Sequence, residues 1–312
     1  MTFNFFMVNL KDTLVIGVSS RALFALEEEN ALYDTLGVEV YQQYQIEREN
    51  MPLEKGTAYH LIESLLKINT SAKNEQSIEV VVMSKNSPDT GLRVLNSISH
   101  YRLPITRSAF TSGKSLSSYI DSFEVDLFLS KSESDIQEVI DSNKCAAALI
   151  YPHPKDYKPD EHTVRIAFDA DAVIFSDDSE QIFKEKGLDI FQKNEKENVD
   201  VPLKEGPFGK FIKLLSRVQS KLNNDLLRIA IVTARDYPAN IRVIKTLRDW
   251  GVNVDEAFFL GGLPKDKVLK AFNAHIFFDD QETYVVPASN VVPSSRVPYN
   301  HNSPLHKNNN KK

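Results

Sequence analysis

The sequence predicts an α/β fold, in which helices cover a mostly parallel β-sheet. Two observations support this prediction. Short apolar segments alternate with longer segments of helical periodicity along most of the 312 residues, and this alternation is typical of a parallel sheet. The order of segments also restarts near residue 163, so the chain divides into two α/β halves. A chain of this length can bury a sizeable core.

The first half is expected to span residues 1–151. Short apolar runs, which fit buried strands, occur at residues 14–18, 78–83, 105–110, 125–129 and 144–151. Apolar residues at helical spacing predict helices in a stretch that ends at residue 44, and at 56–68, 89–101 and 115–122. Residues 152–162 contain three prolines and few apolar residues, which predicts a linker between the halves.

The second half is expected to span residues 163–299. Its predicted strands are 164–169, 228–232, 256–260 and 275–278, and its predicted helices are 178–193, 208–222, 238–249 and 265–272. Residues 177–226 are more than a crossover helix needs, so we expect them to form a small helical cap that closes over a substrate. The polar segment 300–312 is expected to be a disordered tail.

The two halves align as copies of one unit. Subtracting 150 from the numbers of the second half aligns identical residues without a gap, including Ile166 with Ile16, Gly187 with Gly37, Pro202 with Pro52, Leu203 with Leu53 and Gly206 with Gly56. The polar residues at the strand ends differ, because Asp169 aligns with Ser19 and Asp171 with Arg21. We therefore interpret the first half as a degenerate copy and expect one functional site, in the second half.

Composition argues against several classes of protein. The net charge of −6 disfavours nonspecific nucleic-acid binding, which needs a basic surface. No apolar run approaches the roughly 18 residues of a membrane-spanning helix. The single cysteine, Cys145, cannot form an internal disulfide, and the N-terminus lacks the basic segment of a signal peptide, so we expect a cytoplasmic location. Whether the chain forms a homo-oligomer stays open.

Polar side chains follow the predicted strands of the second half, at the points where these strands end. They are, in chain order, Asp169 and Asp171, then Thr233, Ala234 and Arg235, then Lys265, and last Asp279 and Asp280. Because the carboxyl ends of parallel strands meet at one edge of a sheet, we expect these groups to converge. Oxygen ligands without a cysteine and histidine cluster indicate Mg²⁺ and not Zn²⁺.

Each assignment has an ordinary structural alternative. Thr233 precedes a predicted helix and could be its N-cap. Lys267 is a rival for Lys265, and Arg235 could hold a phosphate or pair with a carboxylate. Asp279 and Asp280 could form a turn. In the predicted cap, Phe208 could stack on a base, although helical spacing of aromatic residues is more typical of core packing.

The order of these motifs resembles the haloacid dehalogenase-like phosphatase superfamily. Longer segments are similar to the cytosolic 5′-nucleotidase I family, in the second half Ile-Ala-Phe-Asp-Ala-Asp-Ala-Val-Ile-Phe-Ser-Asp, Val-Thr-Ala-Arg, Phe-Leu-Gly-Gly-x-x-Lys and Ile-Phe-Phe-Asp-Asp-Gln. In the first half, Val-Ser-Ser-Arg-Ala-Leu-Phe and Ser-Pro-Asp-Thr-Gly-Leu-Arg-Val are similar too. The resemblance implies a Rossmann-like fold of the haloacid dehalogenase type and covers nearly the whole chain except the tail.

The resemblance also implies roles for the strand-end residues. Asp169 would be the nucleophile that forms an aspartyl-phosphate, and Asp171 the general acid and base. Mg²⁺ would be held by Asp169, by Asp171 through its backbone carbonyl, and by Asp279 or Asp280. Thr233 would donate a hydrogen bond to a phosphoryl oxygen, and Lys265 would balance charge in the transition state. Apart from the resemblance, Ala234, Arg235 and Phe208 are candidate substrate contacts.

These roles lead to one leading hypothesis and two alternatives. The chain is predicted to be a Mg²⁺-dependent phosphoric monoester hydrolase that converts nucleoside monophosphates, of the AMP or IMP type, to nucleoside and phosphate. A related phosphatase for another small phosphomonoester, such as a sugar phosphate, is the first alternative. The second is a nucleotide-binding or sensing protein without turnover, against which the presence of Asp169 and Asp171 argues.

Overall fold

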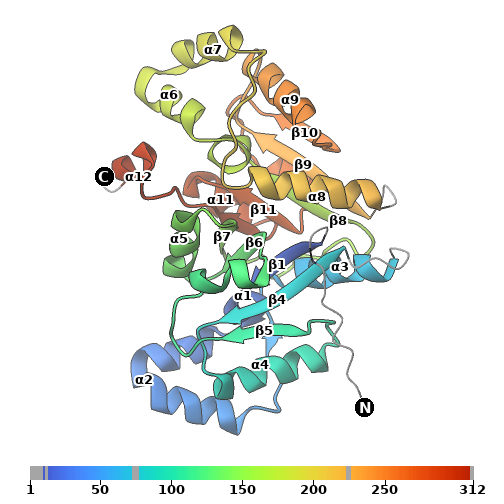
Figure 1. Cartoon of the computed structure of the whole chain (residues 1–312), viewed down its shortest axis with the longest axis vertical. Coiled ribbons are helices and arrows are strands. Elements are labelled where there is room, and N and C mark those ends of the chain that lie inside the picture. Colours follow the sequence, from blue (N-terminus) through green and yellow to red (C-terminus); the bar gives the residue numbers. More distant parts are fainter. Residues whose placement is uncertain (1–9, 11–12, 72–76, 223–225, 310–312) are drawn as a thin grey trace.

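The computed structural model contains a sheet of ten strands that runs the length of the molecule, with helices packed on it (Figure 1). It describes residues 10, 13–71, 77–222 and 226–309. The strand order is β10-β9-β8-β11-β12-β7-β6-β1-β4-β5. Neighbouring strands are parallel except β12 and β7, which pair antiparallel where the two halves meet. The predicted α/β class and mostly parallel sheet are confirmed.

Strands form where apolar runs were predicted. In the first half they are β1 (Leu14–Val18), β4 (Ile78–Ser84), β5 (Arg107–Phe110), β6 (Leu127–Ser130) and β7 (Ala146–Ile150). In the second half they are β8 (Val164–Phe168), β9 (Leu227–Thr233), β10 (Glu256–Phe259), β11 (Ile276–Asp279) and β12 (Ser294–Arg296). The short β12 is polar and was not predicted. A separate antiparallel pair joins β2 (Phe24–Ala25) to β3 (Glu54–Lys55).

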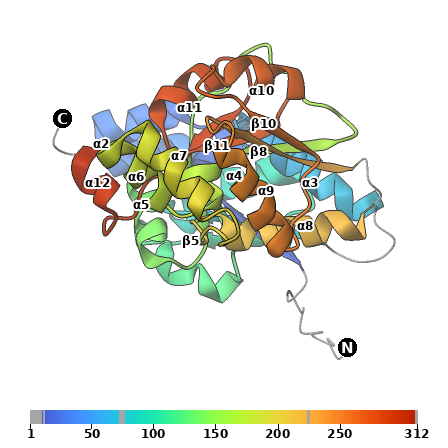
Figure 2. The same ribbon diagram turned by 90° about the horizontal axis from the view of Figure 1, so that it is seen from above.

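The helices cover both faces of the sheet, as the view from above shows for the second half (Figure 2). In the first half they are α1 (Ser20–Leu23), α2 (Glu27–Glu47), α3 (Tyr59–Ser71), α4 (Pro88–His100) and α5 (Glu133–Ser142). In the second half they are α6 (Asp178–Lys186), α7 (Leu188–Glu197), α8 (Gly209–Lys221), α9 (Ala239–Asp249), α10 (Asp266–Phe272), α11 (Glu282–Ser289) and α12 (Pro304–Asn309). The helix predicted at 115–122 is instead a pair of short 3₁₀ turns, and α5, α11 and α12 were not predicted.

The two halves have the same internal strand order. It is β5-β4-β1-β6-β7 in the first half and β10-β9-β8-β11-β12 in the second. Each half also carries a helical hairpin with a glycine at its bend, at φ 83° and ψ 179° for Gly37 and φ 81° and ψ 177° for Gly187. The hairpins, α2 and α6–α7, lie at opposite ends of the molecule (Figure 1).

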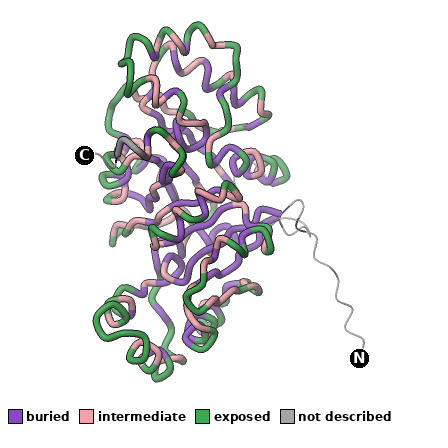
Figure 3. Tube along the Cα trace, turned by 60° about the vertical axis from the view of Figure 1, so that its left-hand side comes forward, coloured by how far each residue is buried: buried purple, intermediate pink, exposed green. Residues whose placement is uncertain are grey.

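One apolar core continues between the halves along the sheet. Figure 3 shows the buried residues concentrated along the strands, with exposed residues on the outer helices. The core joins Leu14 of β1 to Ile229 of β9, and α8 contacts both of these strands. The predicted linker 152–162 contains neither helix nor strand. In the part of the chain that the structure describes, every helix is too short or too polar to cross a bilayer.

The C-terminal segment differs from the disordered tail that was predicted over residues 300–312. Up to residue 309 it is described, and it includes α12. Leu305 is buried against Ala172 and Tyr299, so apolar contacts attach this segment to the second half. Residues 310–312 lie outside the described residues.

Gly206 permits the close approach of two backbone segments and provides a test of the fold. A Cβ at this position would lie 2.1 Å from the carbonyl oxygen of Phe175, in the loop that follows β8. Gly206→Ala is therefore expected to lower the free energy of unfolding by about 1–3 kcal/mol, as overpacking does. Urea denaturation followed by circular dichroism measures this loss.

Gly209→Ala is the matched control. Its Cβ would lie 2.8 Å from the Cβ of Glu205, a milder overlap than the 2.1 Å contact at Gly206, so we expect a smaller loss. Alanine also favours the helix that begins there. Equal losses for Gly206→Ala and Gly209→Ala would contradict this account of the backbone contact.

Candidate active site

A tight turn at the end of β8 separates the two aspartates of the Asp-Ala-Asp motif. Asp169 directly follows the strand, and its N–H donates to the carbonyl of Phe278 in β11 at 2.7 Å. The backbone then reverses at Ala172, which has φ 57°. Asp169 lies beside β11 because β8 pairs with that strand, whereas the side chain of Asp171 lies against Arg235, after β9.

Three buried carboxylates meet between the ends of β8 and β11. Asp169, Asp279 and Asp280 each offer an oxygen, and these oxygens all lie within 4.8 Å of one another. Asp279 is fully buried, and its Oδ1 accepts a hydrogen bond of 2.8 Å from the backbone N–H of Gln281. We call these three residues the carboxylate cluster. The predicted convergence of strand-end groups thus holds for the first and last motifs.

Lys265 is the cation that faces the carboxylate cluster. Its Nζ donates to Asp279 Oδ2 at 2.6 Å and forms an ion pair with Asp169 Oδ1 at 3.0 Å. The lysine is 2% exposed, whereas Lys267 is exposed on α10. Burial acts to lower the pKa of Lys265, but the charges of Asp169 and Asp279 outweigh it and raise the pKa. Lys265, and not Lys267, therefore enters the site as a permanent cation.

The carboxylate cluster is electrostatically undercompensated. Burial raises the pKa of Asp169 to about 7, helped by the charges of Asp279 and Asp171 and opposed by Lys265. Burial also raises the pKa of Asp280 well above its usual range, together with the charges of Asp279 and Asp169. Such shifts arise where carboxylates lie close together without enough positive charge.

The cluster fits a divalent cation bound by oxygen atoms. Its three carboxylates face one ammonium group, which leaves two negative charges when all of them are ionised. Asp280 Oδ1 is buried and accepts no hydrogen bond from the described residues, and the only partner of Asp169 Oδ1 among these residues is Lys265. Hard oxygen donors with unused lone pairs are the ligands that Mg²⁺ prefers.

Asp171 is held away from the carboxylate cluster by a two-pronged ion pair. Arg235 donates from Nε to Asp171 Oδ2 and from Nη2 to Asp171 Oδ1, each at 2.7 Å. Burial acts to lower the pKa of Arg235, but the charges of Asp171 and Glu195 outweigh it. Of the two alternatives for Arg235, a phosphate ligand or a carboxylate partner, the structure shows the carboxylate.

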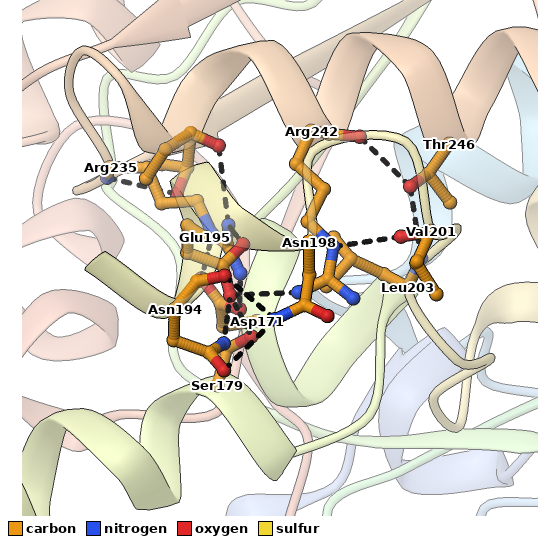
Figure 4. Close-up of polar contacts among 12 residues, drawn as sticks. Asp171, Ser179, Asn194, Glu195, Asn198, Val201, Leu203, Arg235, Arg242 and Thr246 are labelled. Carbon is orange, nitrogen blue, oxygen red and sulfur yellow. Dashed lines mark hydrogen bonds and ion pairs between the residues drawn. The ribbon is translucent and has the colours of Figure 1, made fainter. Parts of the chain in front are cut away.

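Glu195 connects this ion pair to the α6–α7 hairpin (Figure 4). This fully buried glutamate accepts from Arg235 Nη1 at 2.6 Å and from Arg242 Nη1 at 3.0 Å. Ser179 of α6 donates to the same carboxylate at 3.0 Å. The network therefore joins both hairpin helices to α9 and to the Asp171 turn.

Thr233 ends β9 and is buried beside the turn. Its Oγ1 accepts from the backbone N–H of Arg235 at 3.2 Å, so its own hydrogen remains available to a ligand. The alternative role as a helix N-cap is wrong, because α9 begins at Ala239, after Pro238. Ala234, between Thr233 and Arg235, is partly exposed.

Phe208 does not lie where the sequence placed it. Its ring is fully buried and packs on Phe168, Phe211 and Phe278 in the core beneath the strand ends. The prediction that Phe208 contacts a substrate base is therefore wrong. Phe208 and Phe211 pack in the core, as helical spacing of aromatic residues usually indicates.

Tyr299 contributes to the site although the sequence did not indicate it. Its hydroxyl donates to Asp280 Oδ2 and also lies 3.3 Å from Lys184 Nζ of α6. Neither Tyr299 nor Glu195 belongs to a strand-end motif. Both reach the site from segments distant in sequence, so no local pattern identifies them.

Comparison with known proteins agrees with this arrangement. Residues 6–304 match the 5′-nucleotidase family over nearly the whole chain. The chain belongs to the 5′-nucleotidase family. The resemblance stated from the motifs is thereby confirmed.

A curated relative extends the comparison. The chain is 36% identical over 287 residues to human cytosolic 5′-nucleotidase 1B. The alignment covers 88% of this chain and 47% of the human protein, so the chain spans about half the length of that relative. In this member of the 5′-nucleotidase family, the matched region includes both halves and the carboxylate cluster.

The raised pKa of Asp280 leads to a prediction about stability. The folded protein holds this proton more tightly than the unfolded chain, so Asp280 lowers stability as pH rises through its folded pKa. Asp280→Asn removes the charge and keeps an acceptor for Tyr299. In EDTA, the variant should melt at a higher temperature than the parent chain at pH 8, and the difference should shrink at pH 5.

Asp249→Asn provides the control, because Asp249 is exposed on α9. Its melting temperature should follow that of the parent chain at both pH values. A lower melting temperature of Asp280→Asn at pH 8 would mean that the buried carboxylate stabilises the fold.

Proposed function

We propose that this chain is a Mg²⁺-dependent 5′-nucleotidase that hydrolyses nucleoside 5′-monophosphates, of the AMP or IMP type, to nucleoside and phosphate. The observation that carries the proposal is the buried carboxylate cluster facing Lys265, in a chain of the 5′-nucleotidase family. Buried like charges at a strand edge are costly unless a ligand or a reaction uses them.

Asp169 is the proposed nucleophile. Its carboxylate oxygen attacks phosphorus in line, an aspartyl-phosphate forms, and the bond from phosphorus to the 5′-oxygen breaks. Water then attacks the phosphorus, which frees Asp169 and releases phosphate. Lys265, 3.0 Å from Asp169 Oδ1, favours the ionised nucleophile and balances charge on the transferred phosphoryl group.

The proposed ligands of Mg²⁺ are Asp169, Asp279 and Asp280, together with the backbone carbonyl of Asp171. When bound, the ion neutralises charge between these carboxylates and the phosphate. The buried Oδ1 of Asp280, which has no hydrogen-bond partner among the described residues, supports this assignment. The side chain of Asp171 is not among the proposed ligands, since Arg235 holds it.

Asp171 is the proposed general acid and base. It would protonate the departing 5′-oxygen and later take a proton from the attacking water. To do so it must separate from Arg235, and an incoming phosphate is an anion that competes for the same guanidinium. Thr233, the backbone N–H of Ala234 and Arg235 are the proposed phosphate-binding groups.

The second half, residues 163–299, is the proposed catalytic unit of the haloacid dehalogenase type. The α6–α7 hairpin is its proposed cap, a smaller element than residues 177–226 because α8 packs against strands of the sheet. Glu195 ties this hairpin to Arg235, so movement of the hairpin and release of Asp171 are linked. Closure would exclude water from the reacting groups.

The first half, residues 1–151, is proposed to be a degenerate copy of that unit, joined through 152–162. Equal strand order and equal hairpin glycines support this. Contacts correspond as well, since Arg93 Nε donates to the carbonyl of Met51 and Arg242 Nε to that of Val201, both at 2.9 Å. The residues of the second contact follow those of the first by about 150 positions in the sequence.

Location and partners follow from the proposed activity. The name of the human relative contains the word cytosolic, and we propose a cytoplasmic location for this chain. The proposed partner is a nucleoside monophosphate. Nucleic acid and membrane are not proposed as partners, given the acidic net charge and the absence of long apolar segments from the sequence.

Asp169→Asn tests the enzymatic role. The variant should lose AMP and IMP hydrolysis to the level of background, because an amide cannot form the acyl phosphate. Phosphate release in the presence of Mg²⁺ measures the rate, and EDTA should abolish activity of the parent chain. Asp178→Asn, an exposed aspartate of α6, is the control and should retain activity. Background rates for both the parent chain and Asp169→Asn would favour a nucleotide-binding protein without turnover, and equal rates above background would refute Asp169 as the nucleophile.

A panel of phosphomonoesters tests the substrate class. AMP, IMP and other nucleoside 5′-monophosphates are compared with sugar phosphates by kcat/KM at one Mg²⁺ concentration. We expect nucleotides to have the highest kcat/KM values. Faster turnover of sugar phosphates than of every nucleotide would refute the nucleotidase assignment and favour the other phosphatase activity.

A further inference from the structure

The first half contains a cavity of about 460 Å³ at the carboxyl ends of its strands. Ser19, Ser84 and Ser130, which lie at the ends of β1, β4 and β6, line one side, and residues of α2 line another. The volume is in the range of about 300–1,000 Å³ that small-molecule sites occupy. Open α/β sheets bind ligands at this edge, so the cavity is a candidate site of its own.

The chemistry of the cavity differs from that of the carboxylate cluster. Ser19 stands where the second half has Asp169, and Arg21 stands where it has Asp171. The acidic residues of the lining, Glu29 and Asp135, form ion pairs with Arg93 and Lys85. The cavity therefore lacks both a carboxylate nucleophile and a group of free carboxylates for a metal ion.

Two buried donors in the lining have no acceptor. Arg21 Nε and Asn86 Nδ2 make no hydrogen bond to any described residue, and no ion pair of Arg21 occurs there. The Oδ1 of Asn86 accepts from the hydroxyl of Tyr41 at 3.3 Å, which fixes the amide so that Nδ2 is the free group. A buried donor without a partner is unfavourable, so a ligand that offers a hydrogen-bond acceptor would satisfy both groups, and beside an arginine an anionic acceptor is favoured.

Two helix N-termini support the same conclusion. Ser87 and Ser132, the N-caps of α4 and α5, both line the cavity. These helices have 13 and 10 residues, long enough for their amino ends to attract negative charge. Together with the free donors, they make the strand-end side of the cavity suited to a phosphate group.

Aromatic side chains line the other side. Tyr33 and Tyr41 of α2 lie edge to face, with ring centroids 5.7 Å apart, and Tyr33 is 49% exposed. Phe183 and Phe191 form an edge-to-face pair with centroids 6.1 Å apart in the α6–α7 hairpin. Aromatic faces bind bases by stacking. A ligand that joins an anionic group to an aromatic base would use both sides of the cavity.

We propose that this cavity binds a nucleoside phosphate without a metal ion and without hydrolysing it. Arg21 and Asn86 bind the phosphate, and Tyr33 and Tyr41 lie beside the base. The proposal does not depend on hydrolysis by the second half. It assigns the first half a binding role at the carboxyl ends of its own strands, the position equivalent to that of the carboxylate cluster in the second half.

The test measures binding by the full chain carrying Asp169→Asn, in EDTA, by isothermal titration with AMP. We expect saturable binding that Arg21→Met weakens about tenfold or more, as for a lost charge-assisted hydrogen bond. Asn86→Asp should weaken it similarly, by repelling the phosphate. Arg102→Met removes an exposed arginine as the matched control and should leave the Kd unchanged.

Titrations with inorganic phosphate and adenosine separate the parts of the ligand. AMP should bind more tightly than either, and equal Kd values for phosphate and AMP would overturn the nucleoside assignment. Absence of AMP binding in EDTA, or an unchanged Kd in both cavity variants, would overturn the site itself.

Photolabelling with azido-AMP gives an answer that does not depend on the folding of a variant. In the Asp169→Asn chain in EDTA, label in peptides from α2 is expected, and label confined to the second half would refute the proposal. AMP hydrolysis by the parent chain with Mg²⁺ is measured separately. Failure of the parent chain to hydrolyse AMP would overturn the proposed function without changing the binding result.

Discussion

The burial of three carboxylates around one ammonium group is the constraint on which the second half depends. Water cannot solvate Asp169 and Asp279 at the strand ends, and Lys265 offsets only part of their mutual repulsion. The backbone keeps the two carboxylates close despite their repulsion. Asp169 directly follows β8 and Asp279 ends β11, and these strands pair in parallel with Phe168 opposite Phe278. A rigid sheet edge can hold like charges close together, whereas the same charges on separate loops would move apart. The same rigidity would allow the site to bind the proposed cation and phosphate without a rearrangement of the strands.

A second charge network lies near this edge, and its positive and negative charges are equal in number. Arg235 and Arg242 share Glu195, and Arg235 also holds Asp171, so two guanidinium groups meet two carboxylates. Removing one charged group from such a buried network leaves the charge of its partner uncompensated. An anion that binds Arg235 can replace Asp171 without that penalty. In the mechanism that we propose, substrate phosphate would supply the charge that allows Asp171 to move, and the link through Glu195 would bring the hairpin into the same step.

The fold class and strand-end groups were predictable, because each rests on a local pattern. Apolar runs mark β8 and β11 whatever surrounds them, and parallel strands bring their carboxyl ends together, which is why Asp169 and Asp279 were found. Partners that come from elsewhere in the chain leave no such pattern. Glu195 resembles other charged residues of a polar helix, and Tyr299 precedes a low-complexity segment. Phe208 shows the converse error, since an aromatic residue in the predicted cap was assigned to a ligand although the core buries it.

The two halves separate the demands of the fold from those of the chemistry. The first half builds the same strand order with Ser19 and Arg21 where the second has aspartates, so the scaffold itself requires neither carboxylate. What the two edges share is geometry: strand ends, helix amino ends and a helical hairpin bent at a glycine. That geometry favours phosphate whichever side chains are present. Under the roles that we propose, the aspartates add repulsion that a metal ion would relieve and a nucleophile that could react, whereas serine and arginine leave only the capacity to bind. One architecture can thus hold a reacting phosphate at one end of its sheet and an unreacting one at the other.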